Sequence, residues 1–478
     1  GMVLDMTSTN PAGWDNDISP NQGMTYTDAI IYEMHVREMT IDSTSGVKSQ
    51  WRGKFLGMTQ TGTNYQGRAT GLDHLKELGV THVQIMPFND FEASISETDS
   101  ATSGEGLYGW GYNPKNFNTP EGSYSTNPYN GEVRVNELKQ MIQALHSNGI
   151  NVIMDSVYNH VSDGGGFSYN RLVPSYFSRF HGPNDDWSRE NHCNSSGCGN
   201  DFATQRAMAR KYIVDSILYW VEEYHVDGFR FDLAGLIDAE TMNEAINTVH
   251  AKYPNVIFYG EGWEKTDSNM EGATPVSQYF ASQVPEFAFF NHVMRDSAVG
   301  GEHEASDEWG FGMGNSGRAE TVMNSMRAIN WGWANGWYGP MENPSQVINY
   351  VACHDKYTLT DKIWYKTHDE MGERTDISFD WYKAAANRLT NTVILLSQGI
   401  PLMYSGDEIL RQKTKEDGWP AHNSGHEKHD DGTDFTNAEL DRLNAFDWSN
   451  PASTPYADVT KEYYKGLIEF RKNHAALR

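Results

Sequence analysis

Charged and polar side chains recur in this sequence directly after short apolar segments. Four such groups lie far apart in the chain, and each contains a carboxylic acid: Asp155-Ser-Val-Tyr-Asn-His160, Gly228-Phe-Arg-Phe-Asp232, Gly260-Glu-Gly-Trp263 and His354-Asp355. If the apolar segments are parallel strands of a barrel, the residues at their C-terminal ends converge on one pocket. Two or more carboxyl groups in one pocket can hydrolyse a glycosidic bond by nucleophilic and acid/base catalysis.

Asp232 and Glu261 are the candidates for the reacting pair, because they follow consecutive strands. Neighbouring strands favour the short separation of roughly 5–5.5 Å that retaining enzymes need over the wider gap of inverting enzymes. Arg230 points the same way as Asp232 in a strand, so we expect it to keep Asp232 ionised as the nucleophile. Glu261 lies among glycines beside Trp263, a poorly solvated setting that raises a carboxyl pKa and suits a proton donor.

Asp355 comes from a later strand, across the mouth of the predicted barrel. There it can stabilise positive charge on a sugar ring or hold its hydroxyls. Any one of these acids alone is more often a member of a salt bridge at the barrel mouth. Their joint occurrence with Arg230 and His354 favours catalysis.

The elements that position these residues alternate between strand and helix. Eight apolar segments are predicted as strands: 29–32, 82–86, 151–154, 228–232, 256–258, 287–290, 347–351 and 400–403. Helical spacing separates them; Leu72, Leu75 and Leu78, for example, predict a helix that starts after Thr70 and ends at Gly79. Eight alternations favour the α/β class and a closed (β/α)8 TIM barrel over a doubly wound sheet. The sixth unit is the least regular, since residues 296–346 are rich in Gly and Trp.

We expect residues 1–25 to form a polar linker and residues 26–478 to form one barrel. Three long segments follow strands, at about 36–68, 88–135 and 161–203, and are predicted as insertions on the C-terminal face. The chain stops just after the eighth helix, so a C-terminal β-domain is expected to be absent.

The net charge of −27 makes nucleic acid and anionic membranes poor partners, whereas a neutral substrate is allowed. No run of eighteen apolar residues is present, so no membrane span is expected. Three cysteines do not form a disulfide framework. Cys193 and Cys198 can bridge if the protein is exported, but two free thiols are favoured. Gly1 ahead of Met2 indicates a truncated N-terminus, so both a secreted and a cytoplasmic location stay open.

Two further groups of residues have alternative interpretations. A segment after the eighth strand contains His422, His426, His429, Asp430 and Asp431. Its spacing fits no zinc motif, so a solvated acidic loop is favoured over a metal site. Aromatic residues before the seventh strand form either outer sugar subsites or a buried cluster: Trp331, Trp333, Trp337 and Tyr338. Asn159 with acidic loops is an open candidate for structural Ca²⁺.

The four groups of polar residues resemble, in order and spacing, the signature regions of the α-amylase superfamily, glycoside hydrolase family thirteen. The resemblance covers most of the chain. It implies retaining cleavage of α-glucosidic bonds, with Asp232 as nucleophile, Glu261 as acid/base and Asp355 as transition-state stabiliser. It also implies that His160, Arg230 and His354 surround the sugar in the −1 subsite. Two further residues of these regions, Asp155 and Trp263, are expected to bind substrate.

Within that superfamily, Tyr108-Gly-Trp-Gly-Tyr-Asn-Pro114 resembles the marker of the type I pullulanases, which cut α-1,6 branches. The segment Ser196-Gly-Cys-Gly-Asn-Asp201 is similar too. By this resemblance Tyr112 would stack on the −1 sugar, and Trp110 is either a second substrate contact or part of the packing of the motif. Three positions differ from the usual pattern, where Asn, Asp and Asn are typical: Gly109, Asn113 and Lys356.

The resulting hypothesis is a debranching hydrolase that acts on branched α-glucan and requires no cofactor. One alternative is an α-1,4-acting amylase, a neopullulanase-like enzyme or a transglycosylase. A more distant alternative is an inactive homologue that binds glucan. A metal-dependent hydrolase built on the histidine-rich segment is a third. No phosphate-binding loop, nucleotide fingerprint or activated Ser/Cys motif competes with these hypotheses.

Overall fold

A computed structural model describes residues 3–92, 108–182, 191–265, 267–301, 308–328, 341, 343–372, 377–429 and 431–478. Its centre is a closed barrel of parallel strands in the order β1-β14-β13-β12-β11-β10-β7-β4, with β4 pairing back to β1. The strands are β1 Ile31–Met34, β4 His82–Ile85, β7 Asn151–Ser156, β10 Gly228–Phe231, β11 Ile257–Gly260, β12 Ala288–Phe290, β13 Val347–Asn349 and β14 Ile400–Tyr404. The predicted (β/α)8 class is therefore confirmed, and each strand overlaps its predicted segment.

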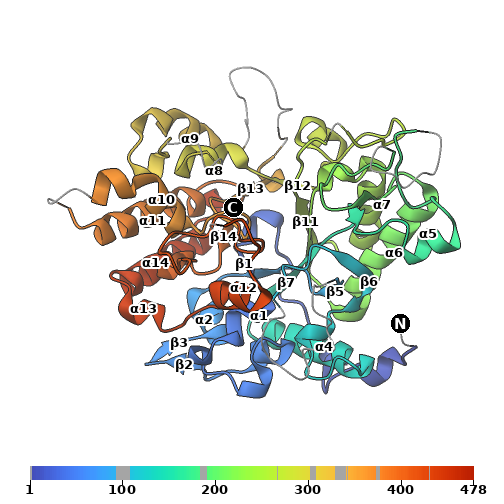
Figure 1. Ribbon diagram of the computed structural model, residues 1–478, viewed down its shortest axis with the longest axis horizontal. Coiled ribbons are helices and arrows are strands. Elements are labelled where there is room, and N and C mark those ends of the chain that lie inside the picture. Colours follow the sequence, from blue (N-terminus) through green and yellow to red (C-terminus); the bar gives the residue numbers. More distant parts are fainter. Residues whose placement is uncertain are drawn as a thin grey trace.

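Helices surround the strands, with α6 and α7 to the right and α10, α11 and α14 to the left in Figure 1. The α-helices are α1 Val36–Ile41, α2 Gly71–Leu78, α4 Gly131–Ser147, α5 Ser168–Leu172, α6 Ala207–Tyr224, α7 Ala239–His250, α8 His292–Val299, α9 Ala319–Ser325, α10 Leu359–Gly372, α11 Phe379–Leu395, α12 Asn437–Asn444, α13 Asn450–Ser453 and α14 Ala457–Asn473. None of the described helices combines the length and the apolar character that a membrane crossing requires.

The interior of the barrel is a packed apolar core. Alternate strand positions point inward, so isoleucines from five strands meet on the axis: Ile31, Ile153, Ile257, Ile348 and Ile400. These side chains are at most 3% exposed, so the barrel is not a pore. The candidate polar residues lie outside this core, at the C-terminal ends of the strands.

The connection between β11 and β12 departs from the alternating pattern. Its described residues form only one helical element, the 3₁₀ helix η9 at Gln278–Gln283. Gly262, Gly272, Pro275 and Pro285 interrupt this connection, and both residue types disfavour a continuous α-helix. The segment instead contributes to the wall of a cavity beside the strand ends.

The long segments after β1, β4 and β7 contain short elements of their own. The first carries the pair β2 Asn64–Tyr65 and β3 Arg68–Ala69, and the second carries β5 Asn89–Phe91 and β6 Pro114–Pro120. The third contains β9 Asn200–Asp201, which pairs with β8 His160–Val161. The predicted aromatic group at 331–338 lies outside the described residues.

The N-terminal segment is held against the barrel by polar contacts. Asp17 Oδ2 lies 2.8 Å from Nδ1 of both His146 and His225. His146 Nε2 lies 2.9 Å from Asp227, which directly precedes β10. Trp14 is 4% exposed and stacks on His225 with ring centroids 4.2 Å apart. Trp14 and Asp17 therefore attach this segment to α4 and to the C-terminal end of α6.

Candidate active site

Strand register brings the candidate acids to one end of the barrel. Arg230 on β10 lies opposite Asp155 on β7 and opposite Tyr259 on β11. Asp232 and Glu261 directly follow the neighbouring strands β10 and β11. A Cβ at Gly260 would lie 2.4 Å from Phe231 O, so glycine allows the close approach of these two strand ends.

Arg230 is the charge centre of the site. Its Nη1 lies 2.9 Å from Asp155 Oδ1 and 3.1 Å from Asp232 Oδ1, and its Nη2 lies 2.6 Å from Glu261 Oε1. The sequence predicted the contact with Asp232 but not the sharing among three acids. One rigid guanidinium therefore fixes Asp232 and Glu261 side by side.

Burial raises the pKa of Glu261 to about 7. Arg230 opposes this shift, whereas the charges of Asp232 and Asp355 strengthen it. The backbone N–H of Leu233 donates to Glu261 Oε2 at 3.0 Å and orients the carboxyl group. The pKa shift has the direction that the sequence predicted, and it leaves Glu261 partly protonated near neutral pH.

Asp155 is the innermost acid of the group and is fully buried. Burial raises its pKa to about 6, although Arg230 and His354 favour its charged form. The Tyr112 hydroxyl donates to Asp155 Oδ2 at 2.6 Å. Asp155 thus holds both Arg230 and Tyr112 in position through its two carboxylate oxygens.

His354 and Asp355 lie on the opposite side of the mouth, after β13. His354 Nδ1 lies 2.8 Å from Glu33 Oε1, and its backbone N–H donates to Glu33 Oε2 at 2.7 Å. Burial opposes protonation, but Glu33 and Asp355 raise the pKa of His354 to about 9. The Asp355 side chain is 45% exposed, so it faces the open part of the site.

Two aromatic residues of the predicted motif pack on His354. The Tyr112 ring is stacked on the imidazole with centroids 4.9 Å apart, and the guanidinium of Arg230 lies 5.5 Å from the centroid of the same ring. Trp110 meets His354 edge-on at 5.0 Å and is only 7% exposed. Tyr112 therefore borders the acids directly, whereas Trp110 supports His354 from the side.

His160 and Asn159 form a third wall. Asn159 Nδ2 donates to the backbone oxygen of Asp232 at 2.8 Å and to its carboxylate at 2.7 Å. His160 Nδ1 lies 2.5 Å from Asn159 Oδ1, and burial lowers the pKa of His160. His160 Nε2 is buried without a hydrogen-bond partner among the described residues. It is therefore available to a ligand.

A cavity of about 580 Å³ opens beside Glu261 and Asp355. Trp263 and Lys356 also line it, and the Trp263 ring meets His292 edge-on with centroids 5.2 Å apart. Lys356 has a left-handed backbone with φ 68°, a conformation that is strained for a non-glycine residue. This conformation turns the chain sharply directly after Asp355.

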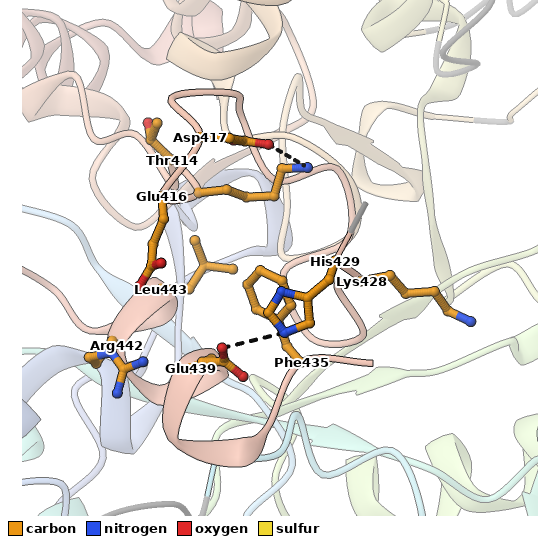
Figure 2. Close-up of a pocket in the computed structure, with 10 residues that line it drawn as sticks. Thr414, Glu416, Asp417, Lys428, His429, Phe435, Glu439, Arg442 and Leu443 are labelled. Atoms are coloured by element: carbon orange, nitrogen blue, oxygen red, sulfur yellow. Dashed lines mark ion pairs between the residues drawn. The ribbon is translucent and has the colours of Figure 1, made fainter. Parts of the chain in front are cut away.

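The histidine-rich segment does not gather its side chains. His422 contacts the Tyr357 ring, His426 contacts Trp110, and His429 packs on Phe435. His429 also lies 3.4 Å from Glu439 in a separate pocket of about 270 Å³, shown in Figure 2. Asp430 lies outside the described residues. Within the described part of the chain, three potential metal ligands meet only at Glu33, Cys353 and His354, where hydrogen bonds already join Glu33 to His354.

Cys193 and Cys198 are free thiols in the structure, the first buried and the second exposed. The structure therefore contains two free thiols here, the favoured alternative, and no disulfide bond between Cys193 and Cys198.

Sequence reasoning missed Glu33, Gln84 and Tyr259 as members of the site. Gln84 Nε2 donates to Glu33 Oε1 at 2.9 Å, and Gln84 Oε1 accepts a hydrogen bond from the Tyr259 hydroxyl at 2.6 Å. All three lie on strands whose neighbours are apolar. A polar residue at an otherwise apolar strand position was the available signal.

Comparisons with known proteins agree with this geometry. Residues 57–176 and 170–477 match the family described as "Alpha amylase, catalytic domain". Over 456 residues the chain is 37% identical to a pullulanase of Bacillus subtilis, covering 94% of this chain and 57% of that protein. It is 30% identical to the chloroplastic pullulanase 1 of Arabidopsis thaliana, covering 86% of this chain and 48% of that protein.

A crystal structure of a pullulanase from Paenibacillus barengoltzii, in complex with maltohexaose and α-cyclodextrin, has a similar fold. The TM-score is 0.84 at 39% identity, covering 100% of this chain and 67% of that one. With 57% of the Bacillus subtilis pullulanase covered, the chain spans little more than half the length of that relative. It belongs to the α-amylase catalytic-domain family, glycoside hydrolase family thirteen, with a barrel that is similar to those of pullulanases.

Proposed function

We propose that the chain is a retaining debranching hydrolase that cleaves α-1,6-glucosidic bonds in branched α-glucans. The observation that carries this proposal is the placement of Asp232 and Glu261 on one guanidinium, with the pKa of Glu261 raised to about 7. Such a pair supplies a nucleophile and a proton donor within one pocket.

The reaction has two displacements. Glu261 gives its proton to the leaving glycosidic oxygen while an Asp232 oxygen attacks C1, so the C1–O bond breaks as the ester forms. Glu261 then takes a proton from water, whose oxygen attacks C1 and releases Asp232. The proposed role of Asp355 is to stabilise the oxocarbenium-like transition state with its negative charge.

The remaining contacts position the sugar. Tyr112 offers an aromatic face next to the acids, and His160 Nε2 is available to bind a hydroxyl. His354, protonated at neutral pH, binds a second hydroxyl with the ring orientation that Glu33 fixes. Trp263 lines the cavity beside Glu261, which suits the leaving part of the substrate. Trp110 acts through His354 as a positioning residue.

The choice of substrate rests on the relatives, which are named pullulanases. The structurally similar pullulanase from Paenibacillus barengoltzii was crystallised in complex with maltohexaose. A neutral glucan also suits a chain with a net charge of −27, which disfavours polyanions. The proposed reaction needs no organic cofactor, because the carboxyl groups perform every proton transfer and the nucleophilic attack. A structural Ca²⁺ stays an open part of the proposal.

Digestion of pullulan, followed by separation of the products, tests the linkage. Maltotriose as the sole product is expected. Panose, or cleavage of amylose without cleavage of pullulan, would contradict the α-1,6 assignment. Products longer than the substrate would favour a transglycosylase.

The assignment of the nucleophile needs a matched pair of variants. Asp232→Asn is expected to abolish hydrolysis, while Glu264→Gln, which alters an exposed acid beside the same cavity, keeps it. Equal rates for Asp232→Asn and the parent would refute the assignment. Binding without hydrolysis in the parent would instead favour a glucan-binding homologue.

A further inference from the structure

Three aromatic rings form an exposed group next to the mouth of the barrel, here called the Trp419 patch: Trp364, His368 and Trp419. Trp364 and His368 are one turn apart on α10 and stack with centroids 4.2 Å apart and ring planes 4° apart. Trp419 comes from the loop after β14 and stands nearly perpendicular to both rings. Its centroid lies 5.4 Å from Trp364 and 5.3 Å from His368.

Trp419 is held at the end of a tight loop. Thr414 bridges to Pro420, and the Lys415 N–H donates to Trp419 O at 2.9 Å. The Asp417 carboxylate accepts the Trp419 N–H at 2.9 Å. The same loop contributes Thr414 and Asp417 to the pocket of Figure 2, from which Trp419 itself is absent. The loop therefore fixes the indole on the side that faces α10.

The Trp419 patch is open to solvent although its rings are well ordered against one another. Trp419 is 46% exposed, and Trp364 and His368 are partly exposed. Tryptophan is highly buried on average, and Trp419 differs from the equally exposed Trp381 in being ordered against two other rings. Rings with fixed orientation and an open face lose little conformational entropy when a flat apolar ligand binds.

The Trp419 patch is continuous with the candidate active site. Tyr357 stands two residues after Asp355 and stacks on Tyr365, with centroids 5.0 Å apart. His422 meets Tyr357 at 4.9 Å and links this wall to the loop that carries Trp419. Along α10, Trp364 lies roughly 8 Å beyond Leu359, at a rise of 1.5 Å per residue. Tyr365 directly follows Trp364 on α10, so this helix connects the wall beside Asp355 to the Trp419 patch.

We propose that the Trp419 patch is an outer subsite that binds the α-glucan chain beyond the sugars held at the catalytic acids. Sugar rings have faces of C–H groups, which pack on the electron-rich faces of aromatic rings. The interaction needs no charge, in keeping with a neutral ligand. The inference rests on the proposed function for the identity of the glucan, but binding to the Trp419 patch does not depend on hydrolysis.

Calorimetric titration of Asp232→Asn with maltotriose and with maltohexaose tests the inference without turnover. The double variant with Asp232→Asn and Trp419→Ala should bind maltohexaose about three- to tenfold more weakly than Asp232→Asn alone, as expected for the loss of one aromatic contact. The affinity for maltotriose should change by less than about twofold, because three sugars are held at the acids. The matched control is Trp381→Ala, since Trp381 on α11 is also 46% exposed and makes no ring contact with the Trp419 patch among the described residues.

Unchanged maltohexaose affinity in Trp419→Ala would overturn the inference, as would an equal loss for both ligands or an equal effect of Trp381→Ala. Trp419→Tyr keeps an aromatic face and should restore most of the affinity, which separates loss of the ring from loss of the fold. Failure of the proposed function would show in the pullulan digest and not in the binding titrations. A parent chain that binds both ligands but leaves pullulan intact refutes the hydrolase and leaves the test of the Trp419 patch in force.

Discussion

Replacing Glu261 with glutamine should stabilise the fold in a pH-dependent way. The pKa of Glu261 rises from 4.5 to about 7 on folding, chiefly because the group is buried. Each pKa unit corresponds to about 1.36 kcal/mol, so ionised Glu261 destabilises the fold by about 3 kcal/mol relative to the protonated form. This penalty is absent below pH 4.5, grows as the pH rises, and is complete above pH 7. Glu261→Gln, which cannot ionise, should be near neutral at pH 4 and stabilising at pH 8.

Urea unfolding of the parent and the variant at both pH values measures the effect. The gain in free energy of unfolding at pH 8 over that at pH 4 should approach about 3 kcal/mol. Glu264→Gln is the control, because it removes an exposed acid three residues along the chain and should act equally at both pH values. If Glu261→Gln shifted stability by the same amount at pH 4 and pH 8, burial would not control the proton affinity of Glu261. Hydrolysis should be lost in this variant at either pH.

Three further predictions test other contacts. Arg230→Met leaves buried acids without their shared cation and should lower the free energy of unfolding by about 3–5 kcal/mol, measured in urea; a loss below 1 kcal/mol would exclude this role. Tyr112→Phe removes the hydroxyl that Asp155 accepts and should raise KM for pullulan a few-fold, measured by initial rates; an unchanged KM would mean that the hydrogen bond does not position the ring. Burial opposes the protonation of His146, but Asp227 raises its pKa to about 9, so this stabilisation is complete below pH 6.5 and is lost as the pH rises through 9. Melting temperatures from pH 6 to 10 should therefore fall more steeply for the parent than for His146→Gln, and parallel curves would contradict the assignment.

The positions of the candidate acids were predictable because each one follows a short apolar run at a barrel strand end. That rule depends on local sequence alone, and it located Asp155, Asp232, Glu261 and Asp355. The sharing of Arg230 depends on cross-strand register, which places it between Asp155 and the residues of β11. The register of the strands is set only when the sheet closes. The sequence therefore predicted only one of the three ion pairs of Arg230, the pair with Asp232.

Glu33 illustrates a second limit. It lies on the first strand, 321 residues before His354, yet its two oxygens accept the backbone and ring N–H groups of that histidine. No spacing rule connects positions so far apart. The expected first strand at 29–32 was also displaced, because β1 runs from Ile31 to Met34 and so includes Glu33. An error of two residues at a strand end was enough to hide this member of the site.

The loops carry the features that local patterns do not predict. Trp419 and Trp364 meet from segments 55 positions apart in sequence, and neither belongs to a periodic pattern near the acids. The histidines at 422, 426 and 429 stand close together in sequence but contact three different rings. Proximity along this loop therefore does not bring the side chains together, whereas proximity across the fold joins Trp419 to Trp364.

The charge of Asp232 links the two displacements of the proposed reaction. Before the reaction, this charge is one of the causes that raise the pKa of Glu261, alongside burial. Once Asp232 forms an ester with the sugar, its charge disappears, and Arg230 is left with one fewer acid to neutralise. Both changes lower the pKa of Glu261 at the moment when it must accept a proton from water. In the proposed reaction, the loss of charge on Asp232 thus favours the ionised, basic form of Glu261, both directly and through Arg230.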